Sequence, residues 1–582
     1  MQLRTLVETL ARLERTRSRQ GVVKLVADLL RDAGSADVEH VVYLLQGRLR
    51  PPYEGVEIAL GEKLIAAAIA EAYGASEAEV TQQLKATGDV GLAAAALAPR
   101  APRQRLSVGR AYELLLEIAG ASGPSSRTRK ISLLAAALRQ VGPDEAKFLL
   151  RVAQGKLRLG IGEQTILDAA ALAALGDRAQ KPLLERAYNV RSDLGGIVRL
   201  AFEKGVRGLA NLGPKLGVPV RPALAQRLPS AEAIIKRLGP VQAEPKYDGF
   251  RLQLHREGER VWAFSRRLEN VTAMFPELVD GVRRHLGSTR AIIEGEAVGY
   301  DRKHGVFLPF QLTMTRKRKT GIAEAAAEYP LRLFAFDLLY VGRTNCLPLP
   351  QEERSRRLQA LVPAAPTNAV TATESCRIAD AAGLQRYFDT MLKRGLEGII
   401  AKRPDAPYQA GSRGYHWVKL KRTSQSHLAD TLDLVVLGYL RGRGKRAKLG
   451  IGSLLAGVYD PEHDRFRTVA KIGSGLTEAG WKDLRIKLDQ SATPAKPPRV
   501  DSLITPDVWV TPKYVVEVLA DEITRSPAHT AGKSGDAPGY ALRFPRIVGG
   551  IRPDKAPEDA TTEREVLELF RMQRRGGRRA SR

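Results

Sequence analysis

The spacing of hydrophobic residues changes along this chain, and no single fold accommodates all of the patterns. Up to about Leu212, Ala- and Leu-rich segments repeat with the helical period and are separated by glycines and prolines. Ser76 stands three residues before Glu79 in "GASEAEVTQQL", the spacing of a capping box that opens a helix. We therefore predict an all-α unit over residues 1–212.

The later patterns are those of short strands. From Gln242 to about Thr423, alternating strands such as "AIIEGEAVGY" are mixed with helices, and beyond Ser424 short strands are separated by turns. A Gly- and Pro-rich stretch near 213–220 marks the first boundary. The predicted chain is multidomain, with an all-α N-terminal domain (1–212), an α+β core (213–423), a small C-terminal β-barrel (424–570) and a basic disordered tail (571–582).

The charge balance favours a polyanionic partner. Lys and Arg number 92 against 64 Asp and Glu, a net charge of +28, which gives a positive field suited to nucleic acid. An anionic membrane is the weaker alternative, because the chain has no run of about 18 apolar residues. The N-terminal segment lacks the pattern of a secretory signal, so we expect a cytoplasmic protein, nucleoid-associated or nuclear. Cys346 and Cys376 are too few for a four-cysteine zinc site, so any metal should be a hard cation held by oxygens.

The stretch "AEPKYDGFRLQLH", residues 243–255, places a lysine against an Asp-Gly turn at the start of a strand. From Arg251 onward polar and apolar residues alternate, and "VWAFS" after "REGER" predicts a returning strand. Lys246 therefore precedes a hairpin. Ordinary turn chemistry with a solvated lysine explains this stretch taken alone, so a functional interpretation depends on the rest of the chain.

Other charged residues of the core share strand faces. Glu294 and Glu296 are two residues apart, as are Lys419 and Lys421, so each pair projects from one side of an otherwise apolar strand. Five more residues extend the set, namely Arg251, Arg266, Phe336, Glu397 and Lys402. A solvated sheet face, or a core position for the phenylalanine, would explain each of them separately.

The order of the motifs is specific where each motif alone is not. "KYDGFR", "SRRLENVT", "EGEAV", "FAFDLLY", "LEGIIAK", "WVKLK" and "LRFPRIVGGIRPDK" follow one another as in the covalent nucleotidyltransferases. Over nearly its whole length the chain resembles ATP-dependent DNA ligases of the archaeal and eukaryotic replicative type. This resemblance implies a nucleotidyltransferase (adenylation) core, an OB-fold for the barrel, and a helical DNA-binding domain that carries "GKLRLGIGEQTI".

The resemblance implies that Lys246 is a nucleophile. It would attack the α-phosphate of ATP, release pyrophosphate and carry AMP, which then passes to the 5′-phosphate of a nick and is displaced by the 3′-hydroxyl. An amine is nucleophilic only when neutral, so cationic neighbours or a bound metal must favour loss of its proton. Each transfer is an in-line displacement, in which positioning and charge neutralisation supply most of the catalysis.

The nucleotide contacts are also implied position by position. Glu296 would bind the ribose, Phe336 would stack on adenine, and Glu244 would lie near the adenine edge. The basic residues implied to contact the ribose or the phosphates of ATP are Arg251, Arg266, Arg413, Lys419, Lys421, Arg552 and Lys555.

Metal and DNA contacts are implied for four further residues. Glu294 and Glu397 would bind or orient Mg²⁺ or Mn²⁺, hard cations that suit carboxylates and phosphates. Lys156 and Arg158 would contact DNA phosphates, since the glycines beside them permit close approach of the backbone. A turn that ends a helix, with exposed charges, is the alternative for the second pair.

The last motif departs from the family pattern. Residues 547–550 separate Arg546 from "IRPDK", so that one residue is inserted and a basic position is replaced by glycine. Arg552, Asp554 and Lys555 still fit the RxDK element, which the resemblance implies to close over the triphosphate.

The sequence leaves alternatives to the ligase open. An RNA-capping guanylyltransferase or RNA ligase shares the lysine chemistry but does not predict the long helical domain. A catalytically silent DNA-binding clamp is the other alternative, although it has no chemical reason to keep the lysine and carboxylates. The expected partners are nicked double-stranded DNA and a sliding clamp as a candidate recruiter, with no membrane, and we expect a monomer.

Overall fold

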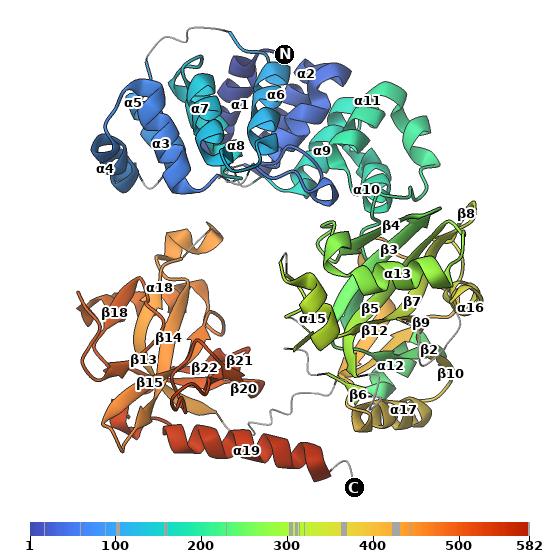
Figure 1. The fold of residues 1–582 in the computed structure, drawn as a ribbon, viewed down its shortest axis with the longest axis vertical. Coiled ribbons are helices and arrows are strands. Elements are labelled where there is room, and N and C mark those ends of the chain that lie inside the picture. Colours follow the sequence, from blue (N-terminus) through green and yellow to red (C-terminus); the bar gives the residue numbers. More distant parts are fainter. Residues whose placement is uncertain are drawn as a thin grey trace. The chain divides into compact units, whose positions relative to one another are not determined.

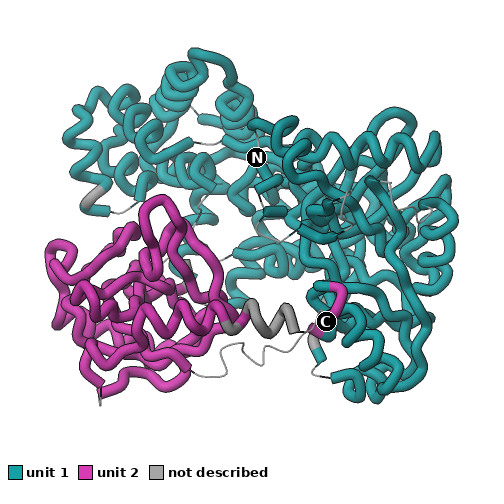
Figure 2. The backbone as a smooth tube through the Cα atoms, turned by 60° about the horizontal axis from the view of Figure 1, so that its bottom comes forward, with its two compact units in different colours: residues 1–391, 395–420 teal, residues 392–394, 421–582 magenta. Residues whose placement is uncertain are grey.

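The computed structural model describes residues 1–582 except 17, 59, 88, 100–104, 156, 158, 160, 229, 302–305, 309–311, 314, 319, 363–368, 422–430, 443, 554 and 580–582. The described chain divides into two compact units, Met1–Met391 with Gly395–Leu420, and Leu392–Arg394 with Lys421–Arg582 (Figure 2). The first unit holds the helical region and the core, and the second holds the C-terminal sheet region. Among the described helices, none is long and apolar enough to cross a membrane.

The N-terminal region is helical, as predicted (Figure 1). Leu, Val, Ile and Ala side chains from one face of each helix form a continuous core. The predicted capping box is present, because the backbone N–H of Ser76 donates to Glu79 at 2.7 Å and that of Glu79 donates to the Ser76 hydroxyl at 3.2 Å. The helices are α1 (Leu3–Arg15), α2 (Arg19–Leu45), α3 (Glu62–Tyr73), α4 (Glu77–Thr87), α5 (Val90–Leu97), α6 (Val108–Gly120), α7 (Ser126–Leu138), α8 (Pro143–Ala153), α9 (Glu163–Ala174), α10 (Lys181–Val190) and α11 (Leu194–Ala210).

The core contains two sheets. One has five strands in the order β1-β12-β11-β2-β10, and the other has seven, β4-β3-β5-β7-β8 with β6 beside β5 and β9 beside β7. Its strands are β1 (Leu224–Arg227), β2 (Val241–Lys246), β3 (Phe250–Glu257), β4 (Arg260–Ser265), β5 (Ala291–Asp301), β6 (Val306–Phe307), β7 (Leu331–Val341), β8 (Thr344–Asn345), β9 (Val370–Ala372), β10 (Cys376–Ile378), β11 (Gly398–Lys402) and β12 (Arg413–Lys421). Its helices are α12 (Ala231–Leu238), α13 (Pro276–His285), α15 (Ile322–Glu328), α16 (Gln351–Leu361) and α17 (Ala381–Lys393). The predicted hairpin is confirmed, since β3 pairs antiparallel with β4.

Strand alternation gives the seven-stranded sheet two different faces. Leu252 and Leu254 of β3 pack in one hydrophobic cluster with Ala335 of β7 and with residues of α13 and α16. The residues that alternate with these leucines, Arg251 and Gln253, face the opposite side of the sheet. The polar side chains of β3 and β5 therefore gather on the face away from these helices.

The C-terminal unit is rich in sheet, as predicted. β13 lies at the centre of an eight-stranded sheet and pairs with β14, β18 and β19. The strands are β13 (Leu432–Leu440), β14 (Ser453–Asp460), β15 (Arg465–Ile472), β16 (Ala492–Thr493), β17 (Val500–Asp501), β18 (Val508–Val510), β19 (Val515–Leu519), β20 (Glu522–Ser526), β21 (Gly539–Arg543) and β22 (Arg546–Ile551), and the helices are α18 (Glu478–Asp489) and α19 (Glu563–Arg579).

Two features of this unit bear on the sequence predictions. In the pairing of β19 with β22, Val518 lies opposite Ile547 while Glu517 lies opposite Gly550, so residues 548 and 549 form a bulge that takes up the inserted residue. The basic tail, 571–582, was predicted to be disordered, and that stays a prediction. α19 extends from Glu563 to Arg579, and its amphipathic first half packs on the sheet with Val566 fully buried.

Candidate active site

Lys246, the last residue of β2, forms an ion pair with Glu397. Glu397 immediately precedes β11, and its backbone N–H donates to the Lys246 carbonyl at 3.1 Å. Because β2 and β11 are antiparallel neighbours, the pairing of the strands itself holds the two side chains together. Both are about a quarter exposed, at 21% and 25%, so a ligand can reach them.

The turn after Lys246 is fixed by close packing. The Tyr247 ring is buried and stacks on Phe334 at 4.2 Å between centroids, and its hydroxyl lies 3.1 Å from that of Thr373. A Cβ atom at Gly249 would collide with the carbonyl oxygen of Ala297 on β5. The Asp-Gly turn is therefore required by the approach of the chain to β5, and it holds Lys246 at the end of its strand.

Glu294 lies at the centre of a buried hydrogen-bond network. Its Oε2 accepts hydrogen bonds from Arg251 at 2.8 Å and from the Tyr408 hydroxyl at 2.6 Å, and its Oε1 accepts one from Gln253 at 3.2 Å. Glu294 is only 1% exposed. Arg251 also donates to the carbonyl of Ala223 at 2.6 Å. The network thus fixes the guanidinium of Arg251 and leaves neither oxygen of Glu294 without a partner.

Glu296 lies opposite Arg251 in the pairing of β3 with β5. Burial raises its pKa to about 7, and the positive charges of Lys246 and Arg251 oppose this rise. Glu296 therefore shares a strand face with Glu294, as predicted, and its electrostatic coupling to Lys246 joins it to the same site.

An aromatic and charged cluster, Phe336 with Trp417, Lys402 and Glu244, lies on β2, β7, β11 and β12. The Phe336 ring is half-buried, with the Arg251 guanidinium 5.2 Å from its centroid and the Trp417 ring at its edge, 5.9 Å away. Lys402 donates to the Phe336 carbonyl at 2.7 Å and forms an ion pair with Glu244 at 2.8 Å. Glu244 and Phe336, both predicted to contact one base, are thus brought together through Lys402.

A second group of arginines lines a cleft of about 360 Å³ between the helical region and the core. Arg266 and Arg267 follow β4, Arg48 comes from the segment after α2, and Arg221 precedes β1. Arg221 donates to Glu163 at 2.9 Å, whereas the other three have no carboxylate partner among the described residues. Arg266 also lines a pocket with Arg251, so the cleft adjoins the nucleotide site.

The remaining predicted residues lie on β12 and in the C-terminal unit. Lys419 is half-buried and shares its strand face with Trp417 by alternation, and β12 ends at Lys421. In the C-terminal unit, Asp433 of β13 pairs with Arg552 at 3.4 Å and with Lys555 at 2.6 Å.

Four predicted positions cannot be placed. Lys156, Arg158 and Asp554 lie outside the described residues, as does the side chain of Arg413, although the backbone of Arg413 begins β12.

The carboxylates do not form a metal site by themselves. Within the described part of the chain, no group of three Asp, Glu, His or Cys side chains could hold a metal ion. Glu397 is accessible and suits a hard cation completed by phosphate oxygens. Glu294 does not suit one, because it is buried and both of its oxygens already accept hydrogen bonds. Glu294 holds Arg251 in this structure, and the expectation that it binds or orients a metal stays a prediction.

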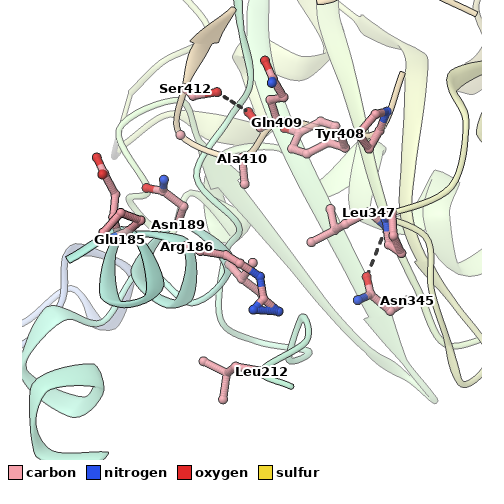
Figure 3. Close-up of a pocket in the computed structure, with 15 residues that line it drawn as sticks. Glu185, Arg186, Asn189, Leu212, Asn345, Leu347, Tyr408, Gln409, Ala410 and Ser412 are labelled. Carbon is pink, nitrogen blue, oxygen red and sulfur yellow. Dashed lines mark hydrogen bonds between the residues drawn. The ribbon is translucent and has the colours of Figure 1, made fainter. Parts of the chain in front are cut away.

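A separate pocket of about 610 Å³ lies between α10 and two loops of the core (Figure 3). Asn189 and Arg186 line it from α10, and Leu347 and Gln409 from the core. Tyr408 forms part of its wall, while the hydroxyl of the same residue binds Glu294. None of the predicted site residues lines this pocket.

Sequence reasoning missed two residues that shape the site. Trp417 lies within the motif "WVKLK", and strand parity already places it on the face of Lys419. Tyr408 carries no local signal, because it lies in a loop and meets Glu294 across 114 residues of sequence.

Comparisons with known proteins identify the family of this chain. The family described as "ATP dependent DNA ligase domain" matches residues 222–421, "DNA ligase N terminus" matches 2–171, and "ATP dependent DNA ligase C terminal region" matches 447–555. A "Probable DNA ligase" of Dictyoglomus turgidum is 45% identical over 98% of this chain and 97% of its own length. A "DNA ligase" of Sulfurisphaera tokodaii is 40% identical over 99% and 98%.

A solved structure, "Pmar-Lig_PreS3", shares the fold with a TM-score of 0.56 at 16% identity, over 93% of this chain and 98% of its own. The family matches favour a ligase over a capping enzyme, because they extend across the helical region, the core and the C-terminal unit. The chain belongs to the family of ATP-dependent DNA ligases and is an enzyme.

Proposed function

We propose that this enzyme seals nicks between a 3′-hydroxyl and a 5′-phosphate in duplex DNA, with AMP carried on Lys246. The observation that carries the proposal is the position of Lys246 at the accessible end of β2, paired with Glu397 and coupled electrostatically to Glu296. The Lys246 amine attacks the α-phosphorus of ATP and the bond to pyrophosphate breaks. The DNA 5′-phosphate then takes the AMP, and attack by the 3′-hydroxyl joins the strand and releases AMP.

The surrounding residues have distinct proposed roles. Phe336 stacks on adenine, Glu244 lies at the edge of the base, and Glu296 holds the ribose. The cations proposed to neutralise the phosphates are Arg251, Arg266, Arg413, Lys419 and Lys421. Because the Lys246 side chain is held by Glu397, it has to leave this ion pair before it can attack.

A divalent cation, Mg²⁺ or Mn²⁺, is proposed at Glu397 together with phosphate oxygens. When bound, such an ion neutralises the charge that develops on a transferred phosphoryl group. Glu294 is proposed to hold Arg251 in position, because it accepts hydrogen bonds from both Arg251 and Tyr408.

DNA contact is proposed for the arginine cleft of Arg48, Arg221, Arg266 and Arg267, and for Lys156 and Arg158. The proposed domains remain 1–212 for DNA binding, 213–423 for adenylation and 424–570 for the OB-fold. A sliding clamp as recruiter, a monomeric state and a cytoplasmic location stay predictions.

In the C-terminal unit, Arg552 and Lys555 are proposed to contact the pyrophosphate during the first step. Their pairing with Asp433 supports the idea that they act together, because one carboxylate holds both cations.

The test is the intact mass of the protein after incubation with ATP or GTP and Mg²⁺. A stoichiometric AMP adduct is expected with the wild-type protein and with Lys236→Ala, which changes an exposed lysine of α12. Lys246→Ala should form no adduct while keeping its fold. An adduct that persists in Lys246→Ala, or a GMP adduct in place of AMP, would contradict the proposal.

A further inference from the structure

Lys402 and Glu244 form a buried ion pair on neighbouring strands of the five-stranded sheet. Their contact is 2.8 Å, and their side chains are 1% and 3% exposed. Burial raises the pKa of Glu244 to about 7, and Lys402 is the main group that opposes this rise. A carboxylate this deep in the protein remains charged near neutral pH only with the help of a cation.

The second oxygen of Glu244 is unusual. Glu244 Oε1 is buried and has no hydrogen-bond partner among the residues that the structure describes. Leaving a buried acceptor unpaired is costly, so such an atom needs an explanation such as a ligand. Because Lys402 links Glu244 to Phe336, the proposed stacking residue, the edge of a bound base is the natural donor.

Lys402 also contacts two aromatic residues of neighbouring strands. Its Nζ donates to the Phe336 carbonyl at 2.7 Å, and it lies 4.4 Å from the centroid of the Trp417 ring and 5.2 Å from that of Phe336. The ammonium group of Lys402 therefore contacts Glu244 of β2, Phe336 of β7 and Trp417 of β12.

Other charged groups face Glu244 but do not replace Lys402. Asp337 raises the pKa of Glu244 and Arg354 lowers it, while Glu244 itself raises the pKa of Tyr387. Arg354 is already committed to Asp337, to which it donates at 2.7 and 3.1 Å. Among the described residues, Lys402 is the cation in direct contact with Glu244.

We propose that Lys402 is a specificity-determining positioning residue, which keeps Glu244 ionised and oriented so that Oε1 accepts a hydrogen bond from the 6-amino group of adenine. This inference rests on the proposed nucleotide site. An ionised carboxylate has only acceptors, so it pairs with an amino group and repels the 6-oxo group of hypoxanthine or guanine. A protonated Glu244 would carry a donor and would no longer discriminate in this way.

The experiment compares ATP with inosine triphosphate, which has a 6-oxo group in place of the amine. Single-turnover formation of the Lys246 adduct is measured at pH 7.5 for the wild type and for Lys402→Met. The expected result is a fall of at least tenfold in the preference for ATP, carried mainly by a raised KM for ATP and with a smaller change in the maximal rate. Lys402→Arg, which keeps the charge, should retain more of the preference than Lys402→Met.

Three further variants sharpen the test. Glu244→Gln should reduce the preference to a similar extent, and Lys402→Met/Glu244→Gln should reduce it little further, because both changes remove one interaction. Lys236→Met, on the exposed face of α12, should behave as the wild type. Lys402→Gln keeps a hydrogen-bond donor for the Phe336 carbonyl but removes the charge. If Lys402→Met does not fold, Lys402→Gln replaces it in the comparison of ATP with inosine triphosphate.

Two outcomes are distinguishable failures. A folded neutral variant at position 402 with the wild-type preference for ATP would overturn the role of Lys402. A wild-type protein that forms no adduct with either nucleotide would instead overturn the proposed function, on which this inference depends.

Discussion

Replacing Glu294 by glutamine separates two roles for this carboxylate. If Glu294 holds Arg251, the change should destabilise the core and misplace the guanidinium. If Glu294 binds the metal, the change should raise the concentration of Mg²⁺ that adenylylation requires. The structure predicts the first result, because Glu294 is buried and both of its oxygens have partners.

The size of the effect follows from the ion pair and its hydrogen bonds. Breaking a buried ion pair by removal of one charge costs about 3 to 5 kcal/mol, since the other charge stays buried. Glutamine keeps one carbonyl oxygen for Arg251 or Tyr408 but turns an NH₂ group toward other donors, so we expect a decrease near the low end, about 3 kcal/mol. For a domain of this size each kcal/mol shifts Tm by about 2 to 4 °C, which gives a fall of about 6 to 12 °C.

The assay is thermal unfolding, followed by titration of Mg²⁺ in single-turnover adenylylation at a temperature where each variant is folded. Glu257→Gln is the matched control, because Glu257 is a partly exposed residue of β3 and pairs with Arg290 at 2.9 Å on the surface. Its expected cost is below about 1 kcal/mol. Glu397→Gln should shift the Mg²⁺ midpoint upward instead. A normal Tm for Glu294→Gln together with a raised Mg²⁺ midpoint would refute this reasoning.

Three other predictions concern an ion pair, a buried histidine and the arginine cleft. Asp433→Asn should weaken the ion pair that holds Lys555 and lower the KM for ATP severalfold in adenylylation, and an unchanged or raised KM would count against the proposed role of Lys555. Burial lowers the pKa of His255 to about 3. As the pH falls below 6.5, the unfolded chain therefore binds a proton at this histidine while the folded protein does not. The unfolding free energy should then fall by up to about 1.4 kcal/mol per pH unit. Urea unfolding between pH 7 and 4 measures that slope, which His255→Gln should reduce. Arg48→Glu with Arg267→Glu should weaken DNA binding and flatten the slope of log K against log salt by about 0.9 for each phosphate that is no longer neutralised, whereas Arg129→Glu on α7 should not.

Hydrophobic spacing predicted most of the fold, because it reports which side of each element is buried. The prediction for the C-terminus rested on composition instead. Six arginines in twelve residues suggested disorder, whereas α19 runs from Glu563 to Arg579. Its first turns are anchored by Val566 and by the contact of Phe570 with Tyr540, and composition does not report such tertiary contacts.

Strand parity also predicted which charged residues share a face of the sheet, but it does not predict how deeply each side chain is buried. Glu294 and Glu296 do lie on one face of β5, and yet Glu294 is enclosed while Glu296 is only half-buried. The difference comes from Tyr408 and from the segment around Ala223, both of which are distant in sequence from β5. A pattern within one strand holds no information about which loop will cover it, so the role of Glu294 could not be predicted.

Four of the cations discussed above have a carboxylate partner, namely Lys246, Arg251, Lys402 and Lys555, and exposure separates these pairs into two kinds. Lys402 with Glu244 and Arg251 with Glu294 are buried, so that removal of either partner would leave an isolated charge at high cost. Lys246 with Glu397 and Lys555 with Asp433 are more exposed, and pairs of that kind contribute little to stability. ATP brings a strongly anionic triphosphate, which can replace a carboxylate only where the existing pair is weak and accessible. We therefore propose that the buried pairs position the residues around the nucleotide, whereas Lys246 and Lys555 exchange their carboxylate partners when ATP binds.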